Sequence, residues 1–329
     1  MRILIVSNQH ADNASLGNPI LYRILCSMRK DNRVEKADFA YFDKSHPIQS
    51  LRTIAAEARN HDIAHVHFGG LYALAVWFAM LGAHCPKLIT FHGTDIHAKA
   101  IKTAKGFAEK AKIRLNQWAS FACILLYKRH GYVAKQLLEY VPRILRQTRA
   151  KREFIQPLGV DYSLFVPTDP RQMREKLGIG KGTQVLFSDV SNSNVKRRDL
   201  AEQIVDRLPA DFHLLVMSGV KPDMVPSYIN ACDMLLLTSD EEGSPNIIRE
   251  CLALNKRVYS VDVGDARQQL DGLANSTVIS RDPDVAARQI IESLKSAYTD
   301  NSRETRQAVI DLDHITGKMI NYYAKLTKA

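Results

Sequence analysis

The residues with the clearest chemical potential lie in TSDEEGSPNIIRECLALN, which runs from Thr238 to Asn255. Two of its acids, Glu242 and Glu250, are eight positions apart, with a glycine-serine-proline turn and the start of an apolar helical pattern between them. Carboxylates suit the hydroxyl groups of sugars, because each oxygen accepts short, charge-assisted hydrogen bonds. The spacing therefore indicates a site for a polyhydroxylated ligand, although an ordinary capped helix with surface acids has the same pattern.

The turn between these acids predicts a helix start, with Ser244 as the N-cap and Pro245 as the first helical residue. The backbone N–H groups of Asn246 and Ile247 then have no partner within the helix and lie at the positive end of its dipole. Such an end is a suitable seat for a phosphate group. One acid precedes the predicted helix and the other lies in its second turn, so the carboxylates would flank this anion seat.

A second polar cluster, FHGTDIH, follows the apolar run KLIT, which is predicted to be a strand. The cluster occupies a strand-to-helix turn, where Thr94 or Asp95 would cap the helix. The residue of chemical interest is His92, because imidazole changes its charge near neutral pH. A structural hydrogen-bonding role and a catalytic role are both compatible with this pattern.

A third cluster, FSDVSNSNVKRRDLAEQI, again has a strand, a polar loop and a helix in succession. It places Lys196, Arg197 and Arg198 at the helix start. Cations there oppose the helix dipole, so a bound anion would explain them. Solvated surface side chains are the alternative.

These clusters belong to a repeated series of apolar runs that are predicted to be strands. In the first half the runs are RILIVSN, VEKADFAYF, IAHVHF, KLITFHG, FACILLY and REFIQPL; in the second they are TQVLFSDV, FHLLVMSG, DMLLLTS, RVYSVDVG and STVIS. Strands rich in Val, Ile, Leu and Phe that alternate with helical segments are typical of right-handed βαβ units. The sequence therefore predicts an α/β fold of two doubly wound parallel-sheet domains, with ligands at the carboxyl ends of the strands in a cleft between them.

The length of 329 residues suits two domains of about 150 residues each. Prolines and glycines interrupt the pattern near residues 159–180. We expect a first domain over residues 1–160, a linker over 161–180 and a second domain over 181–302. The segment 303–329 is predicted to be helical and to pack back on either domain.

The net charge of +10 is concentrated in the first half of the chain. Residues 99–152 contain 14 Lys and Arg but only two acids, Glu109 and Glu139. Such a stretch would attract an anionic partner. No uncharged apolar run reaches the ~18 residues of a membrane span, because stretches such as LYALAVWFAMLGAHC are broken or too short. The five cysteines are scattered without metal-type spacing, so we expect a cytoplasmic protein with reduced thiols.

Together these motifs resemble the retaining nucleotide-sugar glycosyltransferases of family 4, which have the GT-B fold of two Rossmann-like domains. The resemblance covers nearly the whole chain and rests on HGTD, GVDYSLFVP, VKRRDLA, YINACDMLLLTS and EGSPNIIRECLALNKRVYSVDVGD. The spacing from Glu242 to Glu250 matches the E-x7-E motif of that family. The resemblance implies that the first domain binds the acceptor and the second binds the donor.

The resemblance also implies roles for single residues. Glu242 would hold hydroxyls of the donor sugar and Glu250 those of the ribose, while the amides of Asn246 and Ile247, together with Lys196, would bind the diphosphate. His92 would contact the donor sugar near the reacting carbon, and Val220 would border the base. The catalytic residues are thus expected to be His92, Lys196 and Glu242. The remaining donor-binding residues are expected to be Gly17, Asp95, Arg197, Gly243, Ser244 and Pro245.

The chain departs from the family pattern in two places. Ser191 stands five residues before Lys196, where family members usually have an arginine. Arg197, with help from Asn192 or Asn194, is the expected replacement. The glycine-pair loop near the N-terminus is also missing, and ADNASLGNP offers only Gly17.

The resemblance implies transfer with retention from a nucleotide-sugar. We expect a metal-independent reaction with a UDP-sugar as the commoner donor, while the sequence leaves a GDP-sugar open. The expected acceptor is lipid-linked or a polysaccharide in surface glycan biosynthesis. The leaving diphosphate would be stabilised by the cations and the helix N-terminus, and the sequences DPD and DLD give no strong case for a metal. A basic stretch suits peripheral binding at the anionic inner leaflet of a membrane. The alternatives are a UDP-sugar 2-epimerase of the same fold and a non-enzymatic protein that binds nucleic acid or another anion, although no nucleic-acid-binding module is present and the second domain is acidic.

Overall fold

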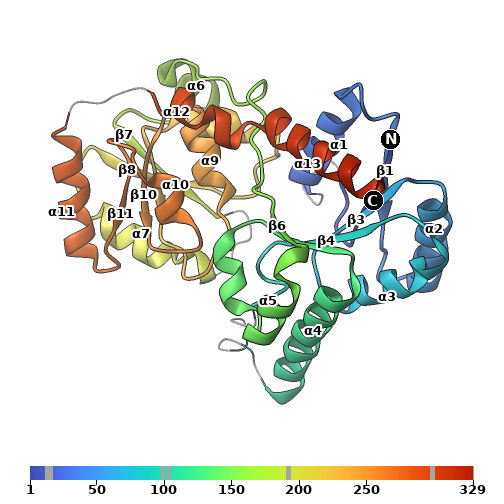
Figure 1. The fold of residues 1–329 in the computed structure, drawn as a ribbon. Helices are drawn as coiled ribbons and strands as arrows, with labels where there is room; N and C mark the ends of the chain where they lie inside the picture. Colours follow the sequence, from blue (N-terminus) through green and yellow to red (C-terminus); the bar gives the residue numbers. More distant parts are fainter. Residues whose placement is uncertain are drawn as a thin grey trace. The chain divides into compact units, whose positions relative to one another are not determined.

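The computed structural model describes residues 1–11, 18–97, 101, 104, 106–189, 194–296 and 301–328. The described chain separates into two compact units. Unit 1 contains the described residues up to Gly159 together with the C-terminal segment from Leu312, and unit 2 contains Val160–Asp311. Figure 1 traces the chain through both units.

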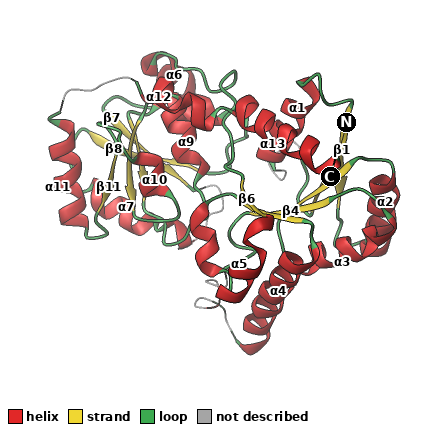
Figure 2. Ribbon diagram, in the orientation of Figure 1, coloured by secondary structure: helices red, strands yellow, loops and turns green. Residues whose placement is uncertain are grey.

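Unit 1 is built on a six-stranded sheet in the order β2-β1-β3-β4-β5-β6, with every neighbouring pair parallel. Its strands are β1 (Arg2–Ser7), β2 (Lys36–Tyr41), β3 (Ile63–His67), β4 (Lys87–Phe91), β5 (Arg129–Tyr132) and β6 (Glu153–Ile155). The central strand β3 is buried at all five positions, as expected for a sheet covered on both faces. Figure 2 shows this sheet among helices of the unit.

The helices of unit 1 alternate with these strands. They are α1 (Pro19–Lys30), α2 (Pro47–Arg59), α3 (Leu71–Ala79), α4 (Phe107–Leu126), α5 (Arg143–Arg149) and α13 (Leu312–Thr327), with 3₁₀ turns η1 (Met80–Gly82), η3 (Lys135–Tyr140) and η4 (Ala150–Arg152). Asn18 caps α1, since its side chain accepts the N–H groups of Ile20 and Leu21. The C-terminal α13 completes the core of unit 1 with Met319, Ile320 and Tyr323.

The run FACILLY is not a strand, contrary to the sequence prediction. Phe121–Leu126 forms the last turns of α4, and the strand that follows is β5, which begins at Arg129. The buried positions of α4 include Ala119, Ser120, Cys123 and Ile124. They recur at helical spacing, and an apolar run of this length does not by itself separate a buried helix end from a strand.

Unit 2 contains a five-stranded parallel sheet in the order β11-β10-β9-β7-β8. Its strands are β7 (Thr183–Ser188), β8 (Phe212–Met217), β9 (Met234–Leu237), β10 (Arg257–Val261) and β11 (Thr277–Ile279). Its helices are α6 (Pro170–Leu177), α7 (Arg198–Val205), α8 (Val225–Ala231), α9 (Asn246–Ala253), α10 (Ala266–Leu270), α11 (Pro283–Leu294) and α12 (Ser302–Ile310), with the 3₁₀ turn η5 (Asn194–Lys196).

The segment predicted to be a linker, residues 161–180, is an ordered part of unit 2. It contains α6, which Asp169 caps, and Arg174 of this helix binds the carboxylate of Asp233 at 2.6 Å. The prolines and glycines of this segment therefore mark a capped helix rather than a free connection. The guanidinium of Arg303 donates to the main chain of Tyr162 and Phe165 and so ties α12 to the same segment.

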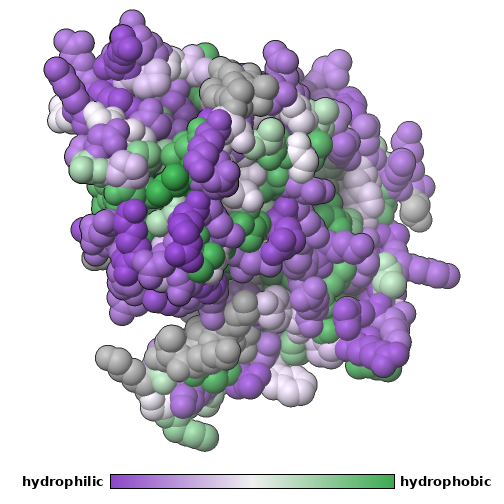
Figure 3. Space-filling model, turned by 90° about the vertical axis from the view of Figure 1, so that its left-hand side faces the viewer, coloured by the Kyte–Doolittle hydropathy of each residue, from purple (hydrophilic) through white to green (hydrophobic). Residues whose placement is uncertain are grey.

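The core of each unit consists of its strands and the inner faces of its helices. The face of the molecule in Figure 3 is mostly hydrophilic, with smaller hydrophobic areas between the polar residues. Among the described residues, no helix combines the length and hydropathy that crossing a membrane requires.

Candidate functional site

The loop after β9 leads directly into α9, but the helix starts one residue later than the sequence predicts. Pro245 occupies the N-cap position and no side chain caps α9. Asn246 and Ile247 are thus the first two helical residues. The expectation that Ser244 is the cap is wrong, because its hydroxyl donates instead to Asp265 at 2.7 Å. Within the described residues, the first amides of α9 therefore have no capping side chain and retain their capacity for an anion.

A buried polar network holds this loop in shape. Arg249, which is only 3% exposed, donates to Ser244, to Asp265 at 3.1 Å and to Asn246 at 3.2 Å. Burial lowers the pKa of Arg249, while the negative charges of Asp265 and Glu250 act in the opposite direction. The network links the first turn of α9 to the start of α10, so the helix start and the preceding acids keep one geometry.

Gly264 allows the loop before α9 to approach the loop that follows β10 closely. Its φ of +55° is in the left-handed region. A Cβ atom added there would lie 2.9 Å from the carbonyl oxygen of Gly243 and 3.1 Å from that of Glu242. A side chain at position 264 would therefore push away the segment that carries Glu242.

Lys196 and Glu242 are brought together from positions 46 residues apart. The lysine Nζ lies 2.6 Å from Oε1 of Glu242, and both side chains are mostly buried. The hydroxyl of Thr238, at the end of β9, donates to the carbonyl oxygens of Lys196 and Arg197. This contact anchors η5 beside the end of β9 and holds the ion pair at the carboxyl end of the sheet.

The neighbouring arginines are paired within the protein. Arg197 has a φ of +54°, and its guanidinium binds Asp199 at 2.9 Å and Asp240 at 3.4 Å. Arg198 pairs with Glu202 at 2.8 Å, one helical turn further on. A bound anion is therefore not needed to explain these two cations, because acids of α7 and of the β9 loop already offset their charge.

The other donor residues expected in unit 2 lie around the same strand ends. Val220 follows β8 and packs partly against the core. Glu250 lies in the second half of α9 and is half-buried. Gly17, Ser191 and Asn192 lie outside the described residues, so the expectations about them stay predictions.

His92 directly follows β4 in unit 1 and is held by two aromatic neighbours. Its ring stacks on Phe68 at a centroid distance of 4.0 Å. Its Nε2 lies 3.0 Å from Nδ1 of His67, which is fully buried. Phe68 has a φ of +68°, which is rare for a bulky residue and costs conformational energy. This backbone conformation brings the ring of Phe68 over His92.

Asp95 closes the turn that carries His92. It is buried, and its carboxylate accepts the N–H groups of Gly69 at 2.7 Å, Gly93 at 2.8 Å and His92 at 3.0 Å. Burial raises the pKa of Asp95, although these backbone hydrogen bonds favour the carboxylate. Asp95 therefore fixes the two turns after β3 and β4.

Burial also keeps the histidines of this region neutral. It lowers the pKa of His67 to about 3 and holds those of His65 and His92 well below the ordinary value. Because both rings of the His67–His92 hydrogen bond are neutral, one ring donates and the other accepts. The hydrogen bond therefore couples the tautomer of His92 to that of His67.

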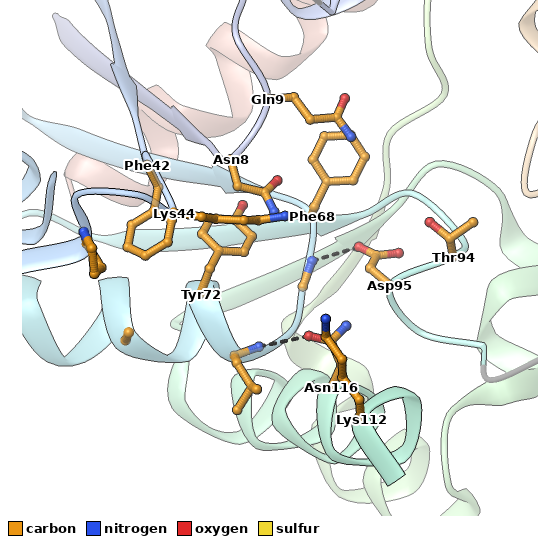
Figure 4. A pocket seen from close by; sticks show the side chains of 14 residues that line it. Asn8, Gln9, Phe42, Lys44, Phe68, Tyr72, Thr94, Asp95, Lys112 and Asn116 are labelled. Atoms are coloured by element: carbon orange, nitrogen blue, oxygen red, sulfur yellow. Dashed lines mark hydrogen bonds between the residues drawn. The ribbon is translucent and has the colours of Figure 1, made fainter. Parts of the chain in front are cut away.

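A cavity of about 520 Å³ opens at the carboxyl ends of β1, β2, β3 and β4 in unit 1. Figure 4 shows polar and aromatic side chains around it. Its lining includes Asn8, Gln9, Lys44, Tyr72, Lys112 and Asn116. Thr94 and Asp95, from the turn of His92, form part of the same wall. This pocket has the mixture of polar groups and ring faces that suits a saccharide.

Only one cluster in the described part of the chain has ligand atoms close enough for a metal ion, namely Asp38, Glu57 and His61. Asp38 already binds Lys36 at 2.6 Å and His61 at 2.9 Å. The lysine offsets the carboxylate charge, so this cluster is a poor cation site.

The sequence patterns did not single out several residues of the site. His67 and the glycine pair after Phe68 belong to HVHFGG, the end of a predicted strand. The histidines and glycines at this strand end were a signal for a functional turn. A Cβ at Gly69 would lie 2.5 Å from the ring of Phe91, so the turn requires glycine there. The sequence indicated more weakly that Arg249 is part of the site, because it is only a single cation within an apolar helical pattern.

No protein-family model matches the chain. In sequence it is 22% identical over 302 residues to the putative teichuronic acid biosynthesis glycosyltransferase TuaC of Bacillus subtilis strain 168, a match that covers 84% of this chain and 74% of TuaC. In structure it is similar to Alr3699/HepE of Anabaena in complex with UDP, with a TM-score of 0.73 at 14% identity over 99% of this chain and 100% of the other. Sucrose-phosphate synthase of Thermosynechococcus elongatus has a TM-score of 0.69 at 14% identity over 100% of both chains.

The chain has the GT-B fold. The predicted resemblance to GT-B glycosyltransferases is confirmed at this level, while membership of family 4 stays a prediction. A UDP-GlcNAc 2-epimerase of Neisseria meningitidis also matches, with a TM-score of 0.58 at 11% identity over 99% of this chain and 100% of the other. The GT-B fold alone therefore does not separate transfer from epimerisation.

Proposed function

We propose that this GT-B protein is a retaining glycosyltransferase, which moves a sugar from a UDP-sugar to a lipid-linked or polysaccharide acceptor in surface glycan biosynthesis. The observation that carries the proposal is the ion pair of Lys196 and Glu242. Glu242 lies four residues before Asn246, where α9 begins without a side-chain cap. A cation, a carboxylate and free helix amides are the groups that a nucleotide sugar requires.

In this proposal the diphosphate binds to the amides of Asn246 and Ile247. Lys196 leaves Glu242 and pairs with the diphosphate, which frees the Glu242 carboxylate for hydroxyls of the donor sugar. Glu250 accepts the ribose hydroxyls, and Val220 borders the base. The UDP bound by HepE supports the choice of uracil.

We assign the acceptor to the 520 Å³ cavity of unit 1. Thr94, on its wall, is two residues from His92, to which we assign a contact with the donor sugar. Because Asp95 is occupied by backbone N–H groups, its proposed role is to position His92 rather than to bind the donor. Because Nε2 of His92 is hydrogen-bonded to His67, the neutral ring of His92 presents one hydrogen-bond donor or one acceptor to the donor sugar.

The proposed reaction needs neither a metal nor a protein nucleophile. An acceptor hydroxyl attacks the anomeric carbon on the face from which UDP departs, and the bond from that carbon to the diphosphate oxygen breaks. The departing phosphate oxygen takes the proton of the acceptor hydroxyl, so the products are the glycoside with retained configuration and protonated UDP. Lys196 and the α9 amides stabilise the developing negative charge.

We also propose that the protein works in the cytoplasm at the inner face of a membrane. The 14 basic residues of the 99–152 stretch support this, since Lys and Arg near an anionic leaflet each contribute about 1 kcal/mol. A lipid-linked acceptor would lie at the same surface.

The first test is a thermal-shift screen of UDP- and GDP-sugars, followed by NMR analysis of the product. We expect UDP-sugars to raise the melting temperature more than GDP-sugars, UDP to be released mainly when acceptor is added, and the anomeric configuration to be retained. An epimerase would instead convert the UDP-sugar without any acceptor. Stabilisation by neither class of nucleotide would contradict the proposal.

A further inference from the structure

One face of α4 is apolar and exposed along nearly the whole helix. Its residues recur at steps of four and three and are Phe107, Ala111, Leu115, Trp118, Ala122 and Leu125, which we call the α4 stripe. Phe107 is 88% exposed, Trp118 68% and Leu115 56%. Large apolar side chains exposed in a continuous row mark an interaction surface rather than ordinary surface variation.

The opposite face of α4 already serves the core of unit 1. Ala119, Ser120, Cys123 and Ile124 are buried there. The helix packs on α3 and α5, which lie beside it at the lower edge of unit 1 in Figure 1. The α4 stripe therefore is a second apolar face, which core packing does not explain.

Cations border the α4 stripe on both sides. At 3.6 residues per turn, Lys110 and Arg114 lie along one border and Lys112 along the other. All three are exposed. The adjacent α5 adds an exposed Ile144 and the basic Arg143. An apolar row between cations is the pattern of a helix that lies in a membrane interface.

We propose that the α4 stripe is the membrane-contacting surface of this protein, with its apolar side chains in the headgroup region of an anionic lipid bilayer and its flanking cations on lipid phosphates. Charge complementarity favours an anionic lipid bilayer over a second copy of this chain as the partner of the α4 stripe. A second copy that paired through the same stripe would bring cations against cations, and the stretch 99–152 has only two acids to offset 14 bases.

The proposed surface adjoins the acceptor cavity of unit 1. Lys112 borders the α4 stripe and also lines the cavity, as Figure 4 shows. A helix seated in lipid would therefore hold the cavity near the headgroups, where a lipid-linked acceptor presents its sugar. The inference rests on the proposed function, which includes a location at the inner face of a membrane, and it adds the surface that makes the contact.

The chain contains only two tryptophans, Trp77 and Trp118, which makes a direct test possible. In the full-length Trp77→Phe variant, Trp118 is the single reporter. Its emission should shift to shorter wavelength with vesicles of phosphatidylcholine and 30% phosphatidylglycerol and not with phosphatidylcholine alone. Wild-type protein should co-sediment with the anionic vesicles, and binding should weaken with salt.

Two variants separate the apolar and the charged contributions. We expect Phe107→Ser/Leu115→Ser and Lys110→Gln/Arg114→Gln each to weaken co-sedimentation at least tenfold. The matched control is Ile48→Ser on α2, which removes a 67% exposed apolar side chain from another surface and should bind as wild type does.

The thermal shift with UDP, measured on the same samples, separates this proposal from the proposed function. No Trp118 shift and no sedimentation, with the UDP shift intact, would overturn the membrane surface and the proposed membrane location but not the proposed nucleotide binding. A lipid-free dimer that Leu115→Ser dissociates would assign the stripe to a second copy instead. A gel shift with RNA in the absence of vesicle binding would assign it to nucleic acid.

Discussion

Lys196 and Glu242 restrain each other in the ligand-free protein. Their 2.6 Å contact neutralises two mostly buried charges, which would be costly to leave unpaired. A diphosphate can replace the carboxylate as the partner of Lys196, and sugar hydroxyls can replace the ammonium as the partner of Glu242. Under the proposed function, the ion pair holds both groups in place for a nucleotide sugar.

Replacement of Lys196 by alanine should weaken UDP binding by about 10-fold to 100-fold, because a charge-assisted contact with the diphosphate is worth roughly 1.5–3 kcal/mol. Isothermal titration calorimetry with UDP measures this change. Arg198→Ala is the matched control, since Arg198 is paired with Glu202 on the exposed face of α7. Equal losses in both variants would mean that general surface charge, rather than Lys196, binds the nucleotide.

At the scale of elements, the network of Arg249, Ser244 and Asp265 fixes the start of α9 against α10. Removal of one member of a buried ion pair leaves the other charge without compensation. The network thus explains how a loop with several polar residues maintains one conformation. It also explains why Ser244 is not available as a helix cap.

Arg249→Met should destabilise unit 2 by about 3–5 kcal/mol, because it leaves Asp265 buried without its cation. Urea unfolding followed by far-UV circular dichroism tests this. Arg267→Met is a suitable comparison, since Arg267 forms a similar pair with Asp262 on an exposed surface, and that change should cost less than about 1 kcal/mol. Similar small losses in both variants would show that the buried network has no special role.

Ten of the eleven described strands could be predicted from apolar runs, because buried parallel strands have few polar interruptions, whereas β5, with the sequence RHGY, lies in no predicted run. FACILLY is the exception, since a buried helix end has the same composition as a strand. The contacts of Ser244 and Arg197 could not be predicted for another reason. The local sequence of Ser244 fits a helix cap, but its partner Asp265 is 21 residues away along the chain. Arg197 binds the nearby Asp199, which the sequence offers as a partner without showing the contact, and also Asp240, which is 43 residues away.

At the scale of the whole molecule, unit 1 is assembled from both ends of the chain. Tyr323 of α13 hydrogen-bonds to His65 of β3, and the other nitrogen of His65 lies 2.8 Å from Thr90. His65 and His67 are both fully buried and neutral. The core of this unit therefore contains two imidazoles that can take up protons only when the unit unfolds.

Unit 1 should lose stability as the pH falls below 6.5. The pKa of His67 is about 3 in the folded state, so between pH 6 and 5 the unfolded state binds the additional protons, and stability decreases with falling pH. Each buried histidine contributes about 1.4 kcal/mol per pH unit in that range. Urea unfolding followed by tryptophan fluorescence reports on unit 1, which contains both tryptophans.

The His67→Gln variant should show a smaller pH slope by about one histidine's contribution. His46→Gln is the control, because His46 is exposed on the surface of the same unit. An unchanged slope in His67→Gln would mean that His67 takes up its proton in the folded state as well.

The most direct test of the proposed activity compares Glu242→Gln with Glu241→Gln, two neighbouring acids of which only Glu242 contacts Lys196. The measurement is kcat/KM for release of UDP from the UDP-sugar that gives the largest thermal shift, in the presence of acceptor. We expect Glu242→Gln to lower kcat/KM at least 100-fold, about 2.7 kcal/mol of transition-state stabilisation, and Glu241→Gln to change it less than about threefold. Full activity in Glu242→Gln, or the same loss in both variants, would contradict the assignment of Glu242 to the donor sugar.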